Sequence, residues 1–185
     1  MMLRVRFGGL GGHGILLAGR VLGTAAIYAG YDAIMTIAYS PEQRGGWSKA
    51  DVIISDEEID YPYLIQPDIL VVTTQEMYER EIESLPLEGF LIYESSLVKP
   101  SKTIDKMIGI PAISIAEKSV KRRIAMNMVL VGGVVALSGF IDPRYVESSI
   151  RSIVRKGTED MNVTAFYKGF EYVREIARIG GVKLE

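Results

Sequence analysis

Two glycine-rich segments carry the residues whose types and spacing suggest binding chemistry. The first, "GGLGGHG", has the spacing G-x-G-x-x-G at Gly9, Gly11 and Gly14, with Gly12 and His13 inside it. It follows a short apolar run and precedes an alanine-rich segment that is typical of a helix. Glycines at such a turn allow a tight bend, and the amides that begin the helix favour a phosphate. The segment predicts either a phosphate-binding turn or a tight turn without a ligand.

The second segment, "YSPEQRGGWSKADVIISD", combines residue types that can bind an anion or fix a loop. It has a proline, a glutamate, an arginine, a glycine pair and a serine directly before a strand-like run: Pro41, Glu42, Arg44, Gly45, Gly46 and Ser48. A guanidinium at position 44 can pair with a carboxylate or phosphate of a ligand, or with Glu42. Trp47, the only tryptophan, is either an interface anchor or an ordinary packing residue.

A dinucleotide site is the first alternative for the glycine turn. Such a site also needs an acidic residue at the end of the second strand, where it binds the ribose. Asp32 has roughly the right separation from the turn, but it begins the second expected strand, which ends in Tyr39, Ser40 and Pro41. A stand-alone NAD-binding or nucleotide-sensing Rossmann-like domain therefore stays the alternative function, and an interaction scaffold with an empty turn is a third.

The composition excludes several kinds of chemistry. The chain has 185 residues, a net charge of −2, no cysteine and a single histidine. Thiolate nucleophiles, disulfides, cysteine-ligated iron–sulfur clusters and multi-histidine metal sites are therefore excluded from this chain. The balanced charge gives no indication of a nucleic-acid partner. We expect no metal site in this chain.

One apolar segment tests whether the chain enters a membrane. Residues 124–141, "IAMNMVLVGGVVALSGFI", carry no charge and reach the lower length limit of a membrane span. Asn127, Ser138 and three glycines lower the hydrophobicity, so we expect a buried helix in a cytoplasmic protein. The segment contains small residues that would let another backbone approach closely: Ala125, Gly132, Gly133, Ala136 and Gly139. We expect that backbone to belong to a partner subunit.

The remaining pattern predicts one domain over residues 1–185. We expect an α/β fold, a three-layer Rossmann-like sandwich with a largely parallel sheet and a helical C-terminal third. The expected strands cover 3–9, 32–40, 50–56, 68–74, 89–95 and 110–116. The expected helices cover 13–30, 75–85, 118–139, 142–157 and 162–181.

The connection between the second and third expected strands is short. It has about ten residues, fewer than a parallel crossover with a helix needs. These two strands are therefore candidates for antiparallel pairing, which would make the sheet mixed. The loop 41–49 starts at the carboxyl end of the second strand, and the glycine turn leaves the carboxyl end of the first. If those strands are neighbours, both loops line one crevice, where open α/β sheets bind ligands.

Together, the two glycine-rich segments resemble the gamma subunit of the 2-oxoacid:ferredoxin oxidoreductases, which is an internal domain in the fused pyruvate enzymes. The family pairs a G-x-G-G-x-G turn with a Pro-Glu-x-Arg-Gly-Gly-x-Ser segment. The turn corresponds here to Gly9, Gly11, Gly12 and Gly14, with His13 where the family usually has glutamine, and the segment corresponds to 41–48. Asn127 in "NMVLVGG" and the segment "NVTAF" at 162–166 also match.

The resemblance implies a subunit without its own catalytic residues. The family converts a 2-oxoacid and coenzyme A into acyl-CoA and CO2 and reduces ferredoxin, and "RGGWS" is more similar to the 2-oxoglutarate branch. Thiamine diphosphate, magnesium and iron–sulfur clusters are expected on alpha, beta and ferredoxin-like partner subunits, with external ferredoxin as acceptor. Coenzyme A is expected at the crevice, and the isolated chain is expected to form a homodimer. The cofactor-binding candidates are Gly9, Gly11, Gly12, His13, Gly14, Glu42, Arg44, Gly45, Gly46, Ser48 and Asn127.

Overall fold

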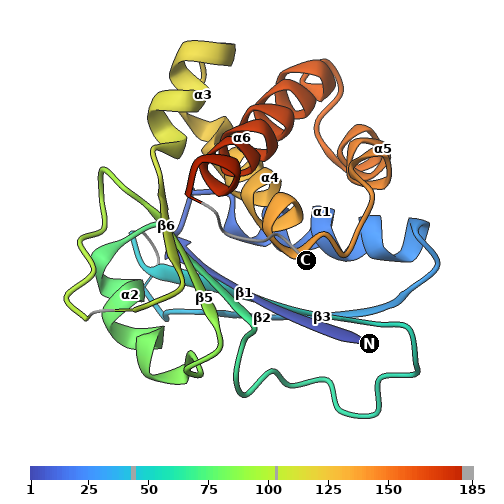
Figure 1. Cartoon of the computed structure of the whole chain (residues 1–185). Helices are drawn as coiled ribbons and strands as arrows, with labels where there is room; N and C mark the ends of the chain where they lie inside the picture. Colours follow the sequence, from blue (N-terminus) through green and yellow to red (C-terminus); the bar gives the residue numbers. More distant parts are fainter. Residues whose placement is uncertain (43–44, 103, 181–185) are drawn as a thin grey trace.

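The computed structural model describes residues 1–42, 45–102 and 104–180. Its six strands form one mixed sheet in the order β2-β3-β1-β4-β5-β6 (Figure 1). β3 runs antiparallel to both β1 and β2, whereas β1, β4, β5 and β6 are parallel. The expected antiparallel pairing of the second and third strands is therefore confirmed. The strands are β1 (Met2–Leu10), β2 (Asp32–Tyr39), β3 (Trp47–Ser55), β4 (Ile69–Val72), β5 (Phe90–Glu94) and β6 (Met107–Ile110).

Helices cover both faces of this sheet, which confirms the three-layer α/β architecture. Successive residues of a strand point to opposite faces. In β1, Gly8 lies against Met77 of α2 (Gln75–Glu81), and Gly9 lies against Ile15 of α1 (Ile15–Tyr28). Figure 1 shows α1 and the C-terminal helices on one side of the sheet and α2 on the other. The other helices are α3 (Ala112–Val120), α4 (Met126–Ser138), α5 (Pro143–Ile153) and α6 (Glu159–Gly180), with 3-10 turns at Ile82–Ser84 and Arg123–Ala125.

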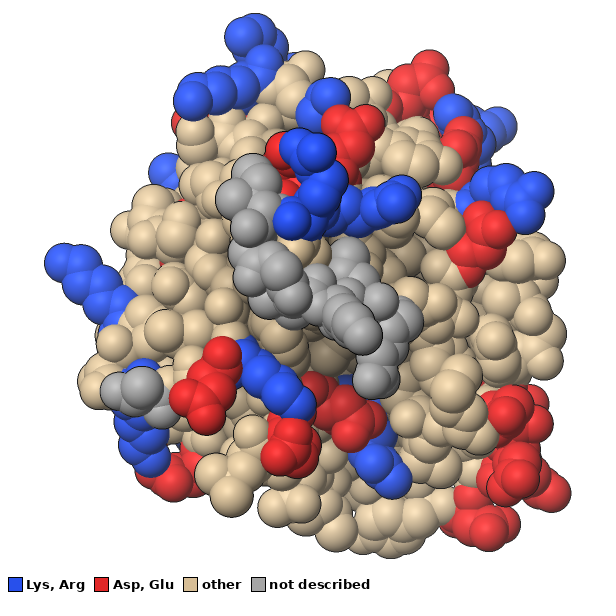
Figure 2. Space-filling model, in the orientation of Figure 1, with Lys and Arg blue, Asp and Glu red and all other residues tan. Residues whose placement is uncertain are grey.

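The main apolar core lies between the sheet and the C-terminal helices. Leu3, Val5 and Phe7 of β1 point toward α1 and belong to this core. At its centre is α4, in which Asn127 is the one polar residue among those buried from Met126 to Ala136. No helix in the described ranges combines the length and the apolar character that a membrane crossing requires. On the face drawn in Figure 2, positive and negative side chains are interspersed.

A buried ion network holds the opposite face of the sheet. Arg6 of β1 binds both carboxylate oxygens of Asp51 through its Nε and Nη2 atoms at 2.8 Å, and its Nη1 donates to Glu81 of α2 at 2.9 Å. Lys49 of β3 also contacts Glu81, at 3.2 Å. The same guanidinium donates to the carbonyl oxygen of Leu64 at 2.7 Å. Arg6 therefore ties β3, α2 and the segment 56–68 to the central strand.

Two expected elements around residue 111 are wrong. The apolar run 110–116 is not a strand, because β6 ends at Ile110 and Pro111, which has no amide hydrogen, is the N-cap of α3. The expected helix 118–139 is interrupted, since Lys121 adopts a left-handed φ of 58° that ends α3. α4 then begins at Met126 after a 3-10 turn. The last helix begins at Glu159, earlier than expected, and its expected end at residue 181 lies outside the described residues.

The small residues of the apolar helix serve a contact inside the chain. A Cβ atom at Gly132 of α4 would lie 2.1 Å from the carbonyl oxygen of Phe166 in α6. Reciprocally, a Cβ atom at Gly169 of α6 would lie 1.9 Å from the carbonyl oxygen of Val129 in α4. The backbone that approaches this helix closely is therefore that of α6. The expectation that a partner subunit uses these small residues is corrected.

Candidate functional site

The two glycine-rich segments meet at the carboxyl edge of β1 and β2. The amide of Gly11 donates to the carbonyl oxygen of Gly46 at 2.7 Å, which extends the β1–β3 ladder into both loops. β1 and β2 are not neighbours, since β3 lies between them. Because β3 is antiparallel to both, their carboxyl ends still lie at the same edge of the sheet. The shared crevice is confirmed, although by this different arrangement.

The crevice is a cleft of about 410 Å³. This volume lies at the lower end of the range for small-molecule pockets. The glycine turn and the first turn of α1 form one wall, and the β2–β3 connection forms the other. The described residues that line it are Gly11, Gly12, Gly14, Ile15, Leu16, Leu17, Tyr39, Ser40, Glu42, Gly45, Gly46, Trp47 and Ser48.

The start of α1 offers backbone amides to this cleft. Its N-cap is Gly14, in a left-handed conformation with a φ of 73° that favours glycine. No side chain caps this helix, and its first turn carries no acidic residue. Ile15, Leu16 and Leu17, which form that turn, line the cleft. Uncapped amides together with the helix dipole make this end of α1 suited to an anion.

Asn127 supports the glycine turn from α4. Its Nδ2 atom donates to the carbonyl oxygen of Gly14 at 3.1 Å, and its Oδ1 atom accepts from the amide of Met128 at 2.9 Å. A side chain at position 14 would collide with this amide group, at 2.3 Å from Nδ2. Asn127 is buried and does not line the cleft. It positions the turn that does.

Ser40 is a cleft residue that sequence reasoning did not select. Its hydroxyl is buried and makes no hydrogen bond of regular geometry within the described residues. The hydroxyl lies beside the exposed Glu42 carboxylate and lowers the pKa of that group. A Cβ atom at Gly46 would lie 1.8 Å from Ser40 Oγ, so a side chain at position 46 would displace this hydroxyl. The available signal was its place directly after β2, next to the matched segment.

His13 lies on the other side of the glycine turn. Its Nδ1 atom is 2.8 Å from Oγ1 of Thr73, which directly follows β4. Burial lowers the pKa of the imidazole, the nearby Arg123 guanidinium lowers it further, and the Glu94 carboxylate opposes them. The neutral ring therefore predominates near neutral pH. Neither His13 nor Gly9 lines the cleft.

The β2–β3 connection brings together most of its matched residues. Gly45, Gly46 and Ser48 line the cleft with Glu42, and Arg44 lies outside the described residues. Trp47 also lines the cleft, and the guanidinium of Arg80 from α2 stacks over its ring, 4.6 Å from the centroid. This stacking fixes one face of Trp47 within the chain.

The geometry disfavours a dinucleotide at this turn. Asp32 pairs with Ser55 of β3, and Ser55 also pairs with Met2 at the start of β1. The acidic residue therefore lies at the end of the sheet opposite the glycine turn. Within the described part of the chain, no three residues among His, Cys, Asp and Glu are grouped as metal ligands.

Comparisons with known proteins agree with one another. The model of the family described as pyruvate ferredoxin/flavodoxin oxidoreductase matches residues 4–172. A 2-oxoglutarate synthase subunit, KorC, of Methanocaldococcus jannaschii is 39% identical over 180 residues, which cover 95% of this chain and 96% of that protein.

Solved structures show the same fold. The gamma subunit of a keto/oxoacid ferredoxin oxidoreductase from Geobacter sulfurreducens superposes with a TM-score of 0.84 at 35% identity, covering 94% of this chain and 97% of that one. The 2-oxoglutarate:ferredoxin oxidoreductase of Magnetococcus marinus, solved with 2-oxoglutarate, coenzyme A and succinyl-CoA bound, has a TM-score of 0.85 at 21% identity. That match covers 94% of this chain and 31% of the other, and it shows the fold alone.

Proposed function

This chain belongs to the pyruvate ferredoxin/flavodoxin oxidoreductase family, and we propose that it is the gamma subunit of a complex that oxidises a 2-oxoacid. In that reaction the 2-oxoacid and coenzyme A give acyl-CoA and CO2, and ferredoxin accepts two electrons. 2-Oxoglutarate is the favoured substrate. It is supported by the 39% identity to a 2-oxoglutarate synthase subunit over nearly the full length of both chains.

We assign the whole chain, residues 1–185, to one gamma-type unit that works with other subunits. The chain has no cysteine, so it cannot hold an iron–sulfur cluster through thiolates. Thiamine diphosphate, magnesium and the clusters are accordingly assigned to alpha, beta and ferredoxin-like subunits, with external ferredoxin as acceptor. This chain supports assembly and binds coenzyme A.

The proposed binding site for coenzyme A is the cleft between the two glycine-rich segments. One observation carries this proposal: the uncapped start of α1 lies on the cleft, and the buried Ser40 hydroxyl lies on the same cleft beside the Glu42 carboxylate. Free amides are donors that suit phosphate oxygens, and the Ser40 hydroxyl adds a donor when it turns away from the Glu42 carboxylate. The cleft volume of about 410 Å³ suits the phosphate-bearing part of coenzyme A, so the rest extends over neighbouring subunits.

The residues of this chain bind and orient, and none is assigned to the chemical step. Gly11 and Gly12 allow the coenzyme to approach the backbone of the turn. Gly14 supplies the left-handed N-cap, and Gly46 leaves room for the Ser40 hydroxyl. Asn127 and His13 hold the turn from behind, through Gly14 and Thr73. Arg44 is proposed as a further anion-binding residue on the strength of the matched segment alone.

The first experiment is a steady-state assay of the reconstituted complex with a low-potential electron acceptor. We expect CoA-dependent reduction of the acceptor with 2-oxoglutarate, and a lower kcat/KM with pyruvate. The isolated chain binding NAD(H), with no effect of this chain on the activity of the other subunits, would overturn the proposal in favour of a nucleotide sensor.

The second experiment locates coenzyme A within that complex. Ser40→Ala removes the hydroxyl from the cleft, and we expect a higher KM for coenzyme A with an unchanged KM for the 2-oxoacid. Ser119→Ala is the matched control, because that hydroxyl only bonds the carbonyl of Ile115 within α3. Gly11→Val would press against the carbonyl of Gly46, 3.3 Å from a Cβ, and should also raise the KM for coenzyme A. Unchanged kinetics in both cleft variants would place the coenzyme elsewhere.

A further inference from the structure

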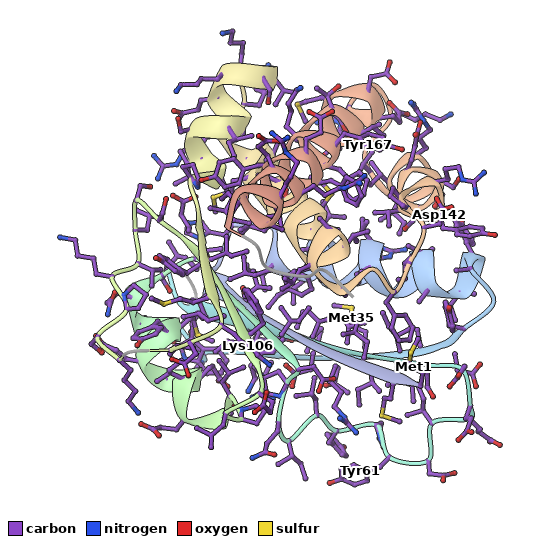
Figure 3. All side chains as sticks on the ribbon, in the orientation of Figure 1. Met1, Met35, Tyr61, Lys106, Asp142 and Tyr167 are labelled. Carbon is purple, nitrogen blue, oxygen red and sulfur yellow. The ribbon has the colours of Figure 1, made fainter. Side chains whose placement is uncertain are left out.

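The two edges of the sheet differ in how they are protected. β6 has four residues and is preceded by Lys106, which is labelled in Figure 3. β2 has eight residues, and its only charged residue, Asp32, is the first. Proteins usually protect free edges with short strands, charges or proline, since unpaired amides and carbonyls recruit other strands. Residues 33–39 of β2 contain neither a charge nor a proline.

The free backbone groups of β2 belong to every second residue. The amide of Ser40 donates to the carbonyl of Trp47 at 3.0 Å, so even-numbered residues direct their hydrogen bonds toward β3. In an antiparallel pair, the odd-numbered residues of β2 then direct their amide and carbonyl groups away from β3. These residues are Ala33, Met35, Ile37 and Tyr39. Ile37 and Tyr39 are also exposed, with 53% and 65% of their surface accessible.

We propose that β2 pairs with β2 of a second copy of this chain, antiparallel across a two-fold axis at Thr36. The sheet then continues from one copy into the other. Such an axis stands perpendicular to the sheet and keeps α1 of both copies on the same face. That face is marked by Met35, whose side chain extends from β2 toward Gly19 of α1 (Figure 3).

In this register, every amide and carbonyl group that β2 directs away from β3 has a hydrogen-bond partner on the second copy. Ala33 lies opposite Tyr39, and Met35 lies opposite Ile37, so each outward-pointing residue meets another one. On the second face, Ile34 meets Ala38 and Thr36 meets its own copy. Large side chains therefore face small or flexible ones without overcrowding, and the Thr36 pair is one that cross-strand pairing favours. A shift of the register by two residues in one direction would place Tyr39 opposite residue 31, outside β2. A shift by two in the other direction would place Ala33 opposite Pro41, which has no amide hydrogen.

The charges of β2 also suit a second copy. Asp32 of each strand falls opposite Ser40 of the other, so no like charges meet across the pair. A surface that pairs with itself is what a closed two-fold dimer requires. Strand addition supplies the backbone hydrogen bonds, and the apolar pairs on both faces fix the register.

A single introduced cysteine tests the register directly, because the chain has none of its own. Thr36→Cys would face itself in a non-hydrogen-bonded pair, where Cα atoms are about 4.5 Å apart and a disulfide can form. We expect the full-length variant to convert to a disulfide-linked dimer on mild oxidation. Ala38→Cys is the matched control on the same strand and face, since the two cysteines would be about 13 Å apart.

A charge on the edge tests the dimer without cysteine. Ile37→Lys should raise the dissociation constant of the dimer about tenfold or more in sedimentation, which corresponds to about 1.4 kcal/mol. Leu87→Lys is the control, because Leu87 is 98% exposed and lies before β5, away from β2. A monomeric wild-type chain, equal crosslinking of both cysteine variants, or an unweakened Ile37→Lys dimer would overturn the proposal. None of these results depends on coenzyme A or on other subunits.

Discussion

Replacing Gly132 with alanine would place a methyl group against the backbone of α6. The added Cβ atom would lie 2.1 Å from the carbonyl oxygen of Phe166 and 2.7 Å from the amide nitrogen of Phe170. Neither obstacle is a side chain that can rotate away. α4 and α6 must therefore part by about 1 Å, which a close-packed interior accommodates poorly. The sheet behind α4 blocks movement in the other direction, because α4 is buried on all sides.

The expected loss in the free energy of unfolding is about 2–4 kcal/mol. Overpacking of a core costs about 1–3 kcal/mol and occasionally more, and a rigid backbone obstacle lies at the upper end. Parting the helices also weakens the dispersion contacts along their whole length. Alanine has a higher helix propensity than glycine, which offsets this loss by up to about 1 kcal/mol. In a chain of this size, the net loss corresponds to a fall in Tm of roughly 5–15 °C.

The assay is urea unfolding followed by circular dichroism, with Gly23→Ala as the matched control. Gly23 is also inside a helix, α1, but a Cβ atom there would meet only Cγ1 of Val52 at an ordinary 3.7 Å. The free energy of unfolding of the control should rise by up to about 1 kcal/mol, because alanine has the higher helix propensity. If Gly132→Ala proves as stable as Gly23→Ala, the close approach of α4 and α6 is refuted.

Other outcomes follow from the same contacts. Arg6→Ala should lower the free energy of unfolding in urea by about 3–5 kcal/mol, because it leaves two buried carboxylates without their guanidinium partner. Arg178→Ala, which loses only an exposed ion pair, should leave the urea midpoint nearly unchanged. The lowered pKa of His13 means that the unfolded chain binds more protons as the pH falls below about 6.5. His13→Gln should therefore lose less stability than the wild type between about pH 7.5 and pH 5.5, and equal losses would contradict this. Trp47→Ala should weaken co-purification with the thiamine-binding subunits more than it lowers the Tm of the chain, although it also removes the stacking with Arg80. The chain alone should show no 2-oxoacid oxidation, and turnover by the pure chain would contradict the assignment of clusters to other subunits.

The sequence was informative where local geometry alone determines the structure. A short connection between strands predicts a hairpin, and glycine spacing predicts a turn at the start of α1, so both walls of the cleft were expected. Asp32 was also recognised as lying at the wrong end of its strand for a dinucleotide.

The errors arise where distant segments decide the outcome. The run 110–116 is apolar enough for a strand, but Pro111 and a hydrogen bond from the Ile113 amide to the buried Glu94 carboxylate make it the start of α3. The small residues of α4 indicated a close backbone, yet only the structure shows that this backbone is α6. Ser40 could not be predicted as a cleft residue, because its burial depends on the close approach of Gly46.

The packing of α5 against α1 has a consequence for synthesis of the chain. Ser149 Oγ of α5 donates to the carbonyl oxygen of Val21 in α1 at 2.7 Å, a contact between residues 128 positions apart. At usual translation rates, roughly 6–25 s pass between the synthesis of α1 and the synthesis of α5, which packs against it. During that time its buried apolar residues have no native partner from the C-terminal helices. Nascent chains of this protein are therefore expected to occupy ribosome-associated chaperones until the last two helices emerge.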